Sequence, residues 1–194
     1  MPSVTKLEAA KRQLNSAIRL LFAGEDAIAV HSLAVGAASL FSDLADHEPD
    51  ITSWREMMRE DHDMTAAQIK GVLNRSWNFF KHADRDPKEQ LEFDEKESEY
   101  IVFFATLECG ELSETTTEMQ IFQLWFLAAG RTRLDDDNET QRFSEVLFPG
   151  VHQLSREKQL LVGAQVLANQ LAAENARPNP LFQRTPAGAA EQSS

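Results

Sequence analysis

The sequence predicts an all-α protein, an antiparallel bundle of about six to seven helices. Apolar residues recur at helical spacings along most of the chain, whereas the alternation of apolar and polar residues that marks strands is nearly absent. Helix caps and stops also divide the chain at short intervals. A chain of 194 residues fits one domain with a sizeable core. We therefore expect one helical domain over residues 1–175 and a disordered tail over 176–194.

The first two predicted helices form a hairpin. The first spans residues 5–23, because Thr5 and Glu8 form a capping-box pattern and Gly24 suits the stop. The second follows directly over residues 26–46. It is apolar nearly all round, which is typical of a central helix in a bundle. The short turn between the two helices predicts an antiparallel arrangement.

Two helices are expected next. A short one is predicted over residues 49–58, opening at a proline. A longer one is predicted over residues 65–83, since Thr65 and Gln68 form a second capping-box pattern. This longer helix should end before Pro87, because a proline disfavours helical backbone in the residue that precedes it.

The second half of the chain predicts three more helices. One begins near Asp94, one is strongly apolar over residues 119–127 and therefore deeply buried, and the last spans residues 155–174. Residues 135–139 are predicted as a solvated loop, since this acidic run lacks the glycine and the distant glutamate of a calcium loop. After Asn175 the chain is rich in proline, glycine and alanine, which favours a disordered tail.

Composition narrows the function classes. A formal net charge of −12 argues against a broad phosphate-binding surface, although it allows a small basic site on an acidic body. No apolar run looks long and charge-free enough to span a bilayer, and the start lacks the apolar stretch of a signal peptide. Cys109 is the single cysteine, so we expect the protein to reside in the reducing cytoplasm, without membrane contact. We interpret Cys109 as small apolar filler, with a nucleophile as the alternative.

The predicted helix over residues 65–83 divides cleanly into an apolar and a polar half. On a wheel of about 100° per residue, Ser76 is the one polar side chain on the apolar half. Arg75 and His82 are seven residues apart and share one face, and Asn78 lies between them, about one turn from each. The helix therefore presents a permanent cation, an amide and an imidazole in a row.

This row suits phosphodiester chemistry in RNA. Arg75 can hold a phosphate in bidentate fashion and stabilise transition-state charge, and His82 can exchange a proton with a ribose hydroxyl. Asn78 can fix the imidazole tautomer or bind a phosphate oxygen. No cofactor or metal is needed. One helix offers a single histidine, so separate acid and base groups require a second copy, most simply in a two-fold homodimer.

The stretch Arg75-Ser76-Trp77-Asn78-Phe79-Phe80-Lys81-His82 resembles the Arg-x(4–6)-His motif of the HEPN superfamily of small helical bundles. The predicted hairpin, with Ala17–Phe22 and Ala29–Ala38, resembles the same group. The resemblance implies a metal-independent endoribonuclease of a toxin–antitoxin, phage-defence or RNA-processing type. It also implies that Arg75 and His82 are catalytic, that the motif helices of two subunits meet in a shared cleft, and that a protein partner such as an antitoxin exists.

Alternatives remain open at each of these positions. The alternatives for the Arg75–His82 face are a solvated polar surface, or the binding face of a non-catalytic interaction or nucleotide-binding module. We interpret His31, in the most apolar helix, as a buried, hydrogen-bonded core histidine. The alternative is a supporting role beside Arg75 and His82. The runs over residues 60–63 and 82–86 contain histidine and carboxylates, but we favour solvated and capping roles over metal binding. The aromatic residues at helical spacings read as core rather than as a ligand pocket.

Overall fold

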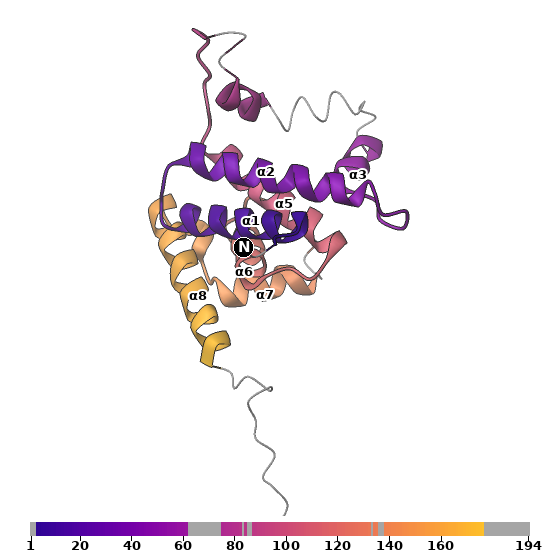
Figure 1. Cartoon of the computed structure of the whole chain (residues 1–194). Coiled ribbons are helices and arrows are strands. Elements are labelled where there is room, and N and C mark those ends of the chain that lie inside the picture. The colour runs from indigo at the N-terminus through magenta and orange to yellow at the C-terminus, as the bar shows by residue number, and fades with distance from the viewer. Residues whose placement is uncertain are drawn as a thin grey trace, which may run out of the picture.

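The computed structural model describes residues 3–61, 75–82, 84, 87–132, 134–135 and 138–176, and this part of the chain is all helical (Figure 1). The all-α helical bundle predicted from the sequence is therefore confirmed. Its named elements, with residues 75–81 forming a further helical stretch, are α1 (Lys6–Phe22), α2 (Ala27–Ala45), α3 (Trp54–Asp61), α5 (Lys96–Leu112), α6 (Thr117–Ala128), α7 (Glu139–Leu147), the 3-10 helix η1 (Val151–Gln153) and α8 (Arg156–Ala176).

Helices α1 and α2 form the predicted hairpin. The capping box at the start of α1 is present: the Thr5 side chain accepts a hydrogen bond from the Glu8 backbone at 3.1 Å, and the Glu8 carboxylate accepts one from the Thr5 backbone at 2.9 Å. Gly24 turns the chain with a φ of 71°, which glycine adopts without strain. Asp26 then caps α2 by accepting from the backbone amide of Ile28 at 2.9 Å.

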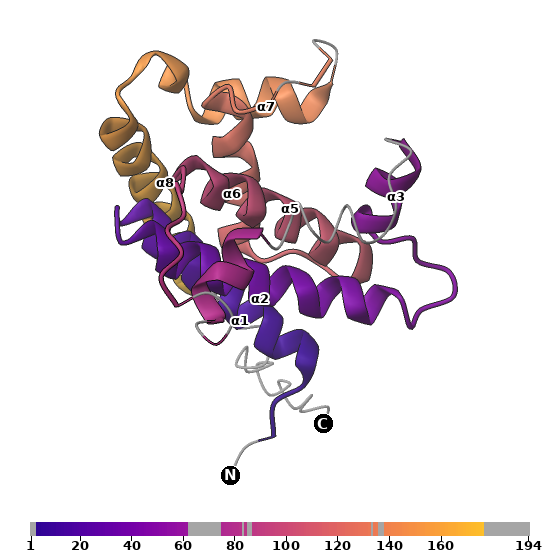
Figure 2. The ribbon, with the colours of Figure 1, turned by 90° about the horizontal axis from the view of Figure 1, so that it is seen from above.

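The core lies where α2 packs against α1 and against α5 (Figure 2). Helix α6 closes the core with aromatic side chains. The Trp125 ring meets Phe22 edge-on at 5.3 Å between centroids, and Phe126 stacks on Phe103 at 4.3 Å. Phe103 and Phe104 of α5 and the aromatic residues of α6 thus belong to the core, as the sequence predicts, whereas Tyr100 of α5 is 50% exposed.

Helix α2 corrects one expectation about composition. Its 19 residues are long and apolar enough to cross a membrane, whereas the sequence analysis found no such run. It contains Asp43 and no glutamate, lysine or arginine. Here α2 packs against both α1 and α5, as a core helix does, and core helices share this composition.

The short helix α3 begins at Trp54 and not at Pro49, and the reason lies in α5. The buried carboxylate of Glu108 accepts hydrogen bonds from the backbone amides of Trp54 at 3.3 Å and Arg55 at 3.1 Å. Ser42 of α2 donates to the same carboxylate at 2.7 Å. A carboxylate at a helix N-terminus satisfies free amides and favours the helix dipole, so the first turn of α3 forms at this point.

Helix α7 is an element that the sequence analysis missed. It begins within the run over residues 135–139 that was predicted to be a loop, because Asn138 accepts from the backbone amides of Thr140 at 2.9 Å and Gln141 at 3.3 Å. In the described part of the chain, no group of three or more histidine, cysteine or acidic residues could hold a metal ion.

A buried ion network joins α5 to α8. The Glu99 carboxylate is fully buried and pairs with Arg131 Nε at 2.5 Å and with Arg156 at the start of α8. Arg131 also donates to the Gln159 side chain at 2.9 Å. Further along α8, Gly163 lies against α1: a Cβ added there would be 2.3 Å from a ring carbon of Phe22. The charged contact of Arg156, the polar contacts of Gln159 and the close backbone approach at Gly163 all hold α8 in place.

Candidate functional site

The helical residues 75–81 lie above α2, on the side of the molecule away from α7 (Figure 1). The predicted division of this segment into two faces is confirmed. Arg75, Asn78, Lys81 and His82 are exposed, whereas Ser76 is buried and the aromatic side chains between them are half-buried. The first half of the predicted helix, including the Thr65–Gln68 capping pattern, falls outside the described residues.

The inner face of residues 75–81 is attached at two points. Ser76 Oγ donates a hydrogen bond of 2.8 Å to Glu97 Oε2 in the first turn of α5. Phe80 meets His31 of α2 edge-on at 5.7 Å and Phe93 at 5.2 Å between ring centroids. A polar contact and an aromatic contact thus fix the rotation of the helix, and this rotation turns Arg75, Asn78 and His82 toward solvent.

The outer face consists of exposed polar side chains. In the described part of the chain, no ion pair or hydrogen bond engages the side chains of Arg75 and Asn78. The ammonium of Lys81 lies 5.2 Å from the centre of the Trp77 ring, a cation–π contact. Arg75 and His82 are about 10.5 Å apart along the axis, so their side chains can reach one phosphodiester group placed over Asn78.

His82 lies beside the exposed carboxylate of Asp84. His82 Nδ1 lies 3.5 Å from Asp84 Oδ1. A carboxylate beside Nδ1 favours the tautomer that places the proton on this nitrogen, which leaves Nε2 free to accept a proton from a substrate. The sequence analysis treated Asp84 only as part of a capping or metal run. Its other members, Ala83, Arg85 and Asp86, lie outside the described residues, as do His62 and Asp63 of the earlier run.

His31 is buried, as predicted, but its surroundings differ from the prediction. It is 2% exposed, and in the part of the chain that the structure describes neither ring nitrogen has a hydrogen-bond partner. The ring is held between Phe80 and Phe93. It therefore supports the helix of Arg75 and His82 from the apolar side, through Phe80, and no described hydrogen bond or ion pair links it to the polar row.

Two contacts of this site were not predicted. The pairing of Ser76 with Glu97 had one signal in the sequence, since Ser76 is a lone polar residue on the apolar half of the wheel. The packing of Phe93 on His31 had none, because residues 91–93 read only as a connecting loop. Both contacts depend on tertiary structure that joins segments far apart in the chain.

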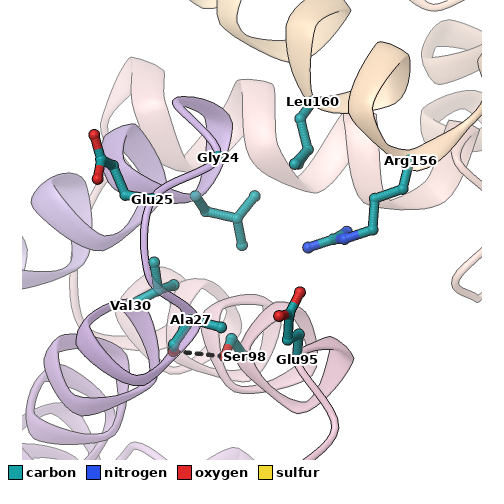
Figure 3. Close-up of a pocket in the computed structure, with 9 residues that line it drawn as sticks. Gly24, Glu25, Ala27, Val30, Glu95, Ser98, Arg156 and Leu160 are labelled. Carbon is teal, nitrogen blue, oxygen red and sulfur yellow. Dashed lines mark hydrogen bonds between the residues drawn. The ribbon is translucent and has the colours of Figure 1, made fainter.

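The remaining candidates are less suited to chemistry. Cys109 is buried, and burial raises the pKa of its thiol, which disfavours the nucleophilic thiolate and supports the filler interpretation. A small pocket of about 60 Å³ lies where the α1–α2 turn meets α5 and α8 (Figure 3). Arg156 and Glu95 reach into it from opposite sides. Its volume holds a few waters and excludes a nucleotide.

Comparison with protein-family models, with curated proteins and with solved structures gave no match to this chain, so the candidate site rests on its own geometry.

Proposed function

We propose that the exposed face of residues 75–82 binds the RNA backbone and cleaves it without a metal, in a HEPN-like dimer of two such chains. The observation behind the proposal is the exposed row of Arg75, Asn78 and His82 on a helix whose opposite face is anchored to α2 and α5. A row held at fixed rotation presents its groups in a preorganised arrangement, which transition-state stabilisation requires.

Each residue of the row has a role in this reaction. Arg75 binds the non-bridging phosphate oxygens, and Asn78 donates to the same group. His82 Nε2 takes the proton from the ribose 2′-hydroxyl, whose oxygen forms a bond to phosphorus while the bond to the 5′-oxygen breaks. The leaving oxygen receives a proton from the second histidine of the dimer. The products are a 2′,3′-cyclic phosphate and a 5′-hydroxyl.

A second candidate is a non-catalytic module that binds a protein or a nucleotide through the same face. The net charge of −12 favours it, because an acidic body weakens the long-range attraction of RNA. Two exposed cations on an acidic body, Arg75 and Lys81, suit a compact anionic ligand. In this case the face binds its ligand and cleaves nothing.

The deciding experiment incubates the purified chain with a mixed RNA pool in excess chelator. We expect cleavage to fall about 10²–10⁴-fold in His82→Ala, as for loss of a general acid–base, and by about 10²–10³-fold in Arg75→Ala, as for loss of a charge-stabilising donor. The matched controls Arg12→Ala and His152→Ala remove the same groups from exposed positions on α1 and η1 and should cleave normally. All variants are first compared for helicity by circular dichroism.

The outcomes separate the two functions. Cleavage by the parent and the controls alone supports the nuclease. Equal cleavage by all five proteins contradicts it, since the activity then has another source. A parent that binds RNA or a nucleotide without cleaving it, with binding lost in Arg75→Ala, favours the non-catalytic module.

A further inference from the structure

We propose that protonation of His31 releases residues 75–82 from α2 and α5, so that acidity controls whether this helix is docked. The inference goes beyond the proposed function, because it concerns how the helix is attached and holds whether or not the helix cleaves RNA. It starts from an imidazole that is 2% exposed and has no hydrogen-bond partner in the described part of the chain.

The site of His31 accepts only the neutral ring. Phe80 and Phe93 stand edge-on to it at 5.7 and 5.4 Å, with interplanar angles of 90° and 87°. An imidazolium has two N–H donors and a charge, and a buried charge is strongly disfavoured without paired acceptors. Phenylalanine side chains supply no acceptor of that kind. Protonation therefore favours a state in which the ring meets water, and Phe80 is the side chain that covers it from the helix.

The charged groups around His31 do not remove this conflict. From α5, the exposed Glu97 is close enough to favour the proton, but its carboxylate accepts from Ser76. On residues 75–82, Arg75, Lys81 and His82 are exposed and positively charged or titratable, so none is an acceptor for an imidazolium. On the segment before α5, Glu92 and Asp94 flank Phe93 and are exposed. Just before α2, Asp26 is engaged as the N-cap of the helix.

Glu97 makes the two attachments of the helix depend on each other. Among the described residues, Glu97 is the carboxylate that favours a charged His31, and it also accepts the hydrogen bond from Ser76. When the protonated ring turns toward Glu97 or toward water, it displaces Phe80 and competes with Ser76. The aromatic and the polar attachment are therefore lost together, which is how a two-state release behaves.

The direction of the pH dependence follows from burial, which lowers the pKa of His31 in the docked state. In the released state the exposed ring has its ordinary pKa of about 6.5. Above that value both states are neutral and docking is fully stable. As the pH falls below it, the released state takes up the proton first, and docking weakens until the lowered pKa of the docked ring is passed.

The test is amide hydrogen exchange on the full chain between pH 7.5 and 5, corrected for the intrinsic pH dependence of exchange. We expect protection of residues 76–81 to fall by about tenfold for each unit by which the docked pKa is lowered, while α1 and α6 stay protected. His31→Phe keeps an apolar ring without a proton, so its protection should be independent of pH. His82→Gln is the matched control on the same helix and should lose protection as the parent does.

Three results would overturn the inference. One is pH-independent protection of residues 76–81 in the parent. Another is a loss of protection that persists in His31→Phe, which would assign it to a carboxylate. The third is an NMR titration of the His31 ring at or above its ordinary pKa, a readout available even if His31→Phe does not fold. None of these measurements uses RNA, so failure of the His31 proposal and failure of the nuclease proposal are distinguishable.

Discussion

The buried ion network between α5 and α8 gives a sharp stability prediction. Replacing Glu99 with glutamine removes the carboxylate that pairs with both Arg131 and Arg156, whose side chains are only 16% and 33% exposed. Removing one partner of a buried pair destabilises a protein by about 3–5 kcal/mol, because a charge stays buried without compensation. Arg156 retains some contact with water and Arg131 keeps its bond to Gln159, so we expect the lower end, about 3 kcal/mol.

That loss is large beside a total stability of about 5–15 kcal/mol. For a chain of this size, a change of about 3 kcal/mol lowers the melting temperature by roughly 6–12 °C. Urea unfolding followed by circular dichroism measures the change directly. The matched control is Glu95→Gln, which removes the same charge beside Arg156 from the exposed side of the pocket (Figure 3) and should change stability by less than about 1 kcal/mol. A loss in Glu99→Gln no greater than in this control would refute the reasoning.

Two further stability predictions concern the close approach at Gly163 and the buried carboxyl of Glu108. Gly163→Ala places a Cβ 2.3 Å from the Phe22 ring and should destabilise by about 1–3 kcal/mol in urea unfolding, whereas Gly110→Ala, with its nearest atom at 3.9 Å, should be neutral or stabilising by up to about 1 kcal/mol. Equal effects of the two would show that the α1–α8 approach is not tight. Burial raises the pKa of the Glu108 carboxyl in the folded protein. Protonation of Glu108 therefore stabilises the folded protein as the pH falls from this raised pKa toward the ordinary pKa of the unfolded chain. Unfolding at a series of pH values should show this component in the parent and not in Glu108→Gln, and identical pH profiles would contradict it.

The elements that were predicted correctly are those defined by their own sequence. Helix α1 has its cap and its stop within a few residues of its ends, at Thr5, Glu8 and Gly24. The exposed row of Arg75, Asn78 and His82 likewise follows from helical periodicity alone. In both cases the determining interactions are local, so a single sequence contains them.

The elements that were missed divide into two kinds. The start of α3 depends on Glu108, which is 54 residues away from Trp54, and no local pattern indicates such a partner. The missed helix α7 is different, because its cap residue Asn138 is adjacent in sequence and the acidic residues before it were read as a loop. The two attachments of the candidate site belong to the first kind, since Glu97 and Phe93 meet residues 75–81 only in the folded chain.

The cap that α5 provides for α3 also constrains the order in which the chain can fold during synthesis. A helix of eight residues is unstable by itself in water, so α3 needs the Glu108 carboxylate to persist. The ribosome adds Glu108 54 residues after Trp54, a delay of roughly 3–11 s at about 5–20 residues per second. For that interval the α1–α2 hairpin also lacks α5, and its apolar face is open to chaperones. Completion of α5 therefore buries the hairpin and caps α3 in a single event.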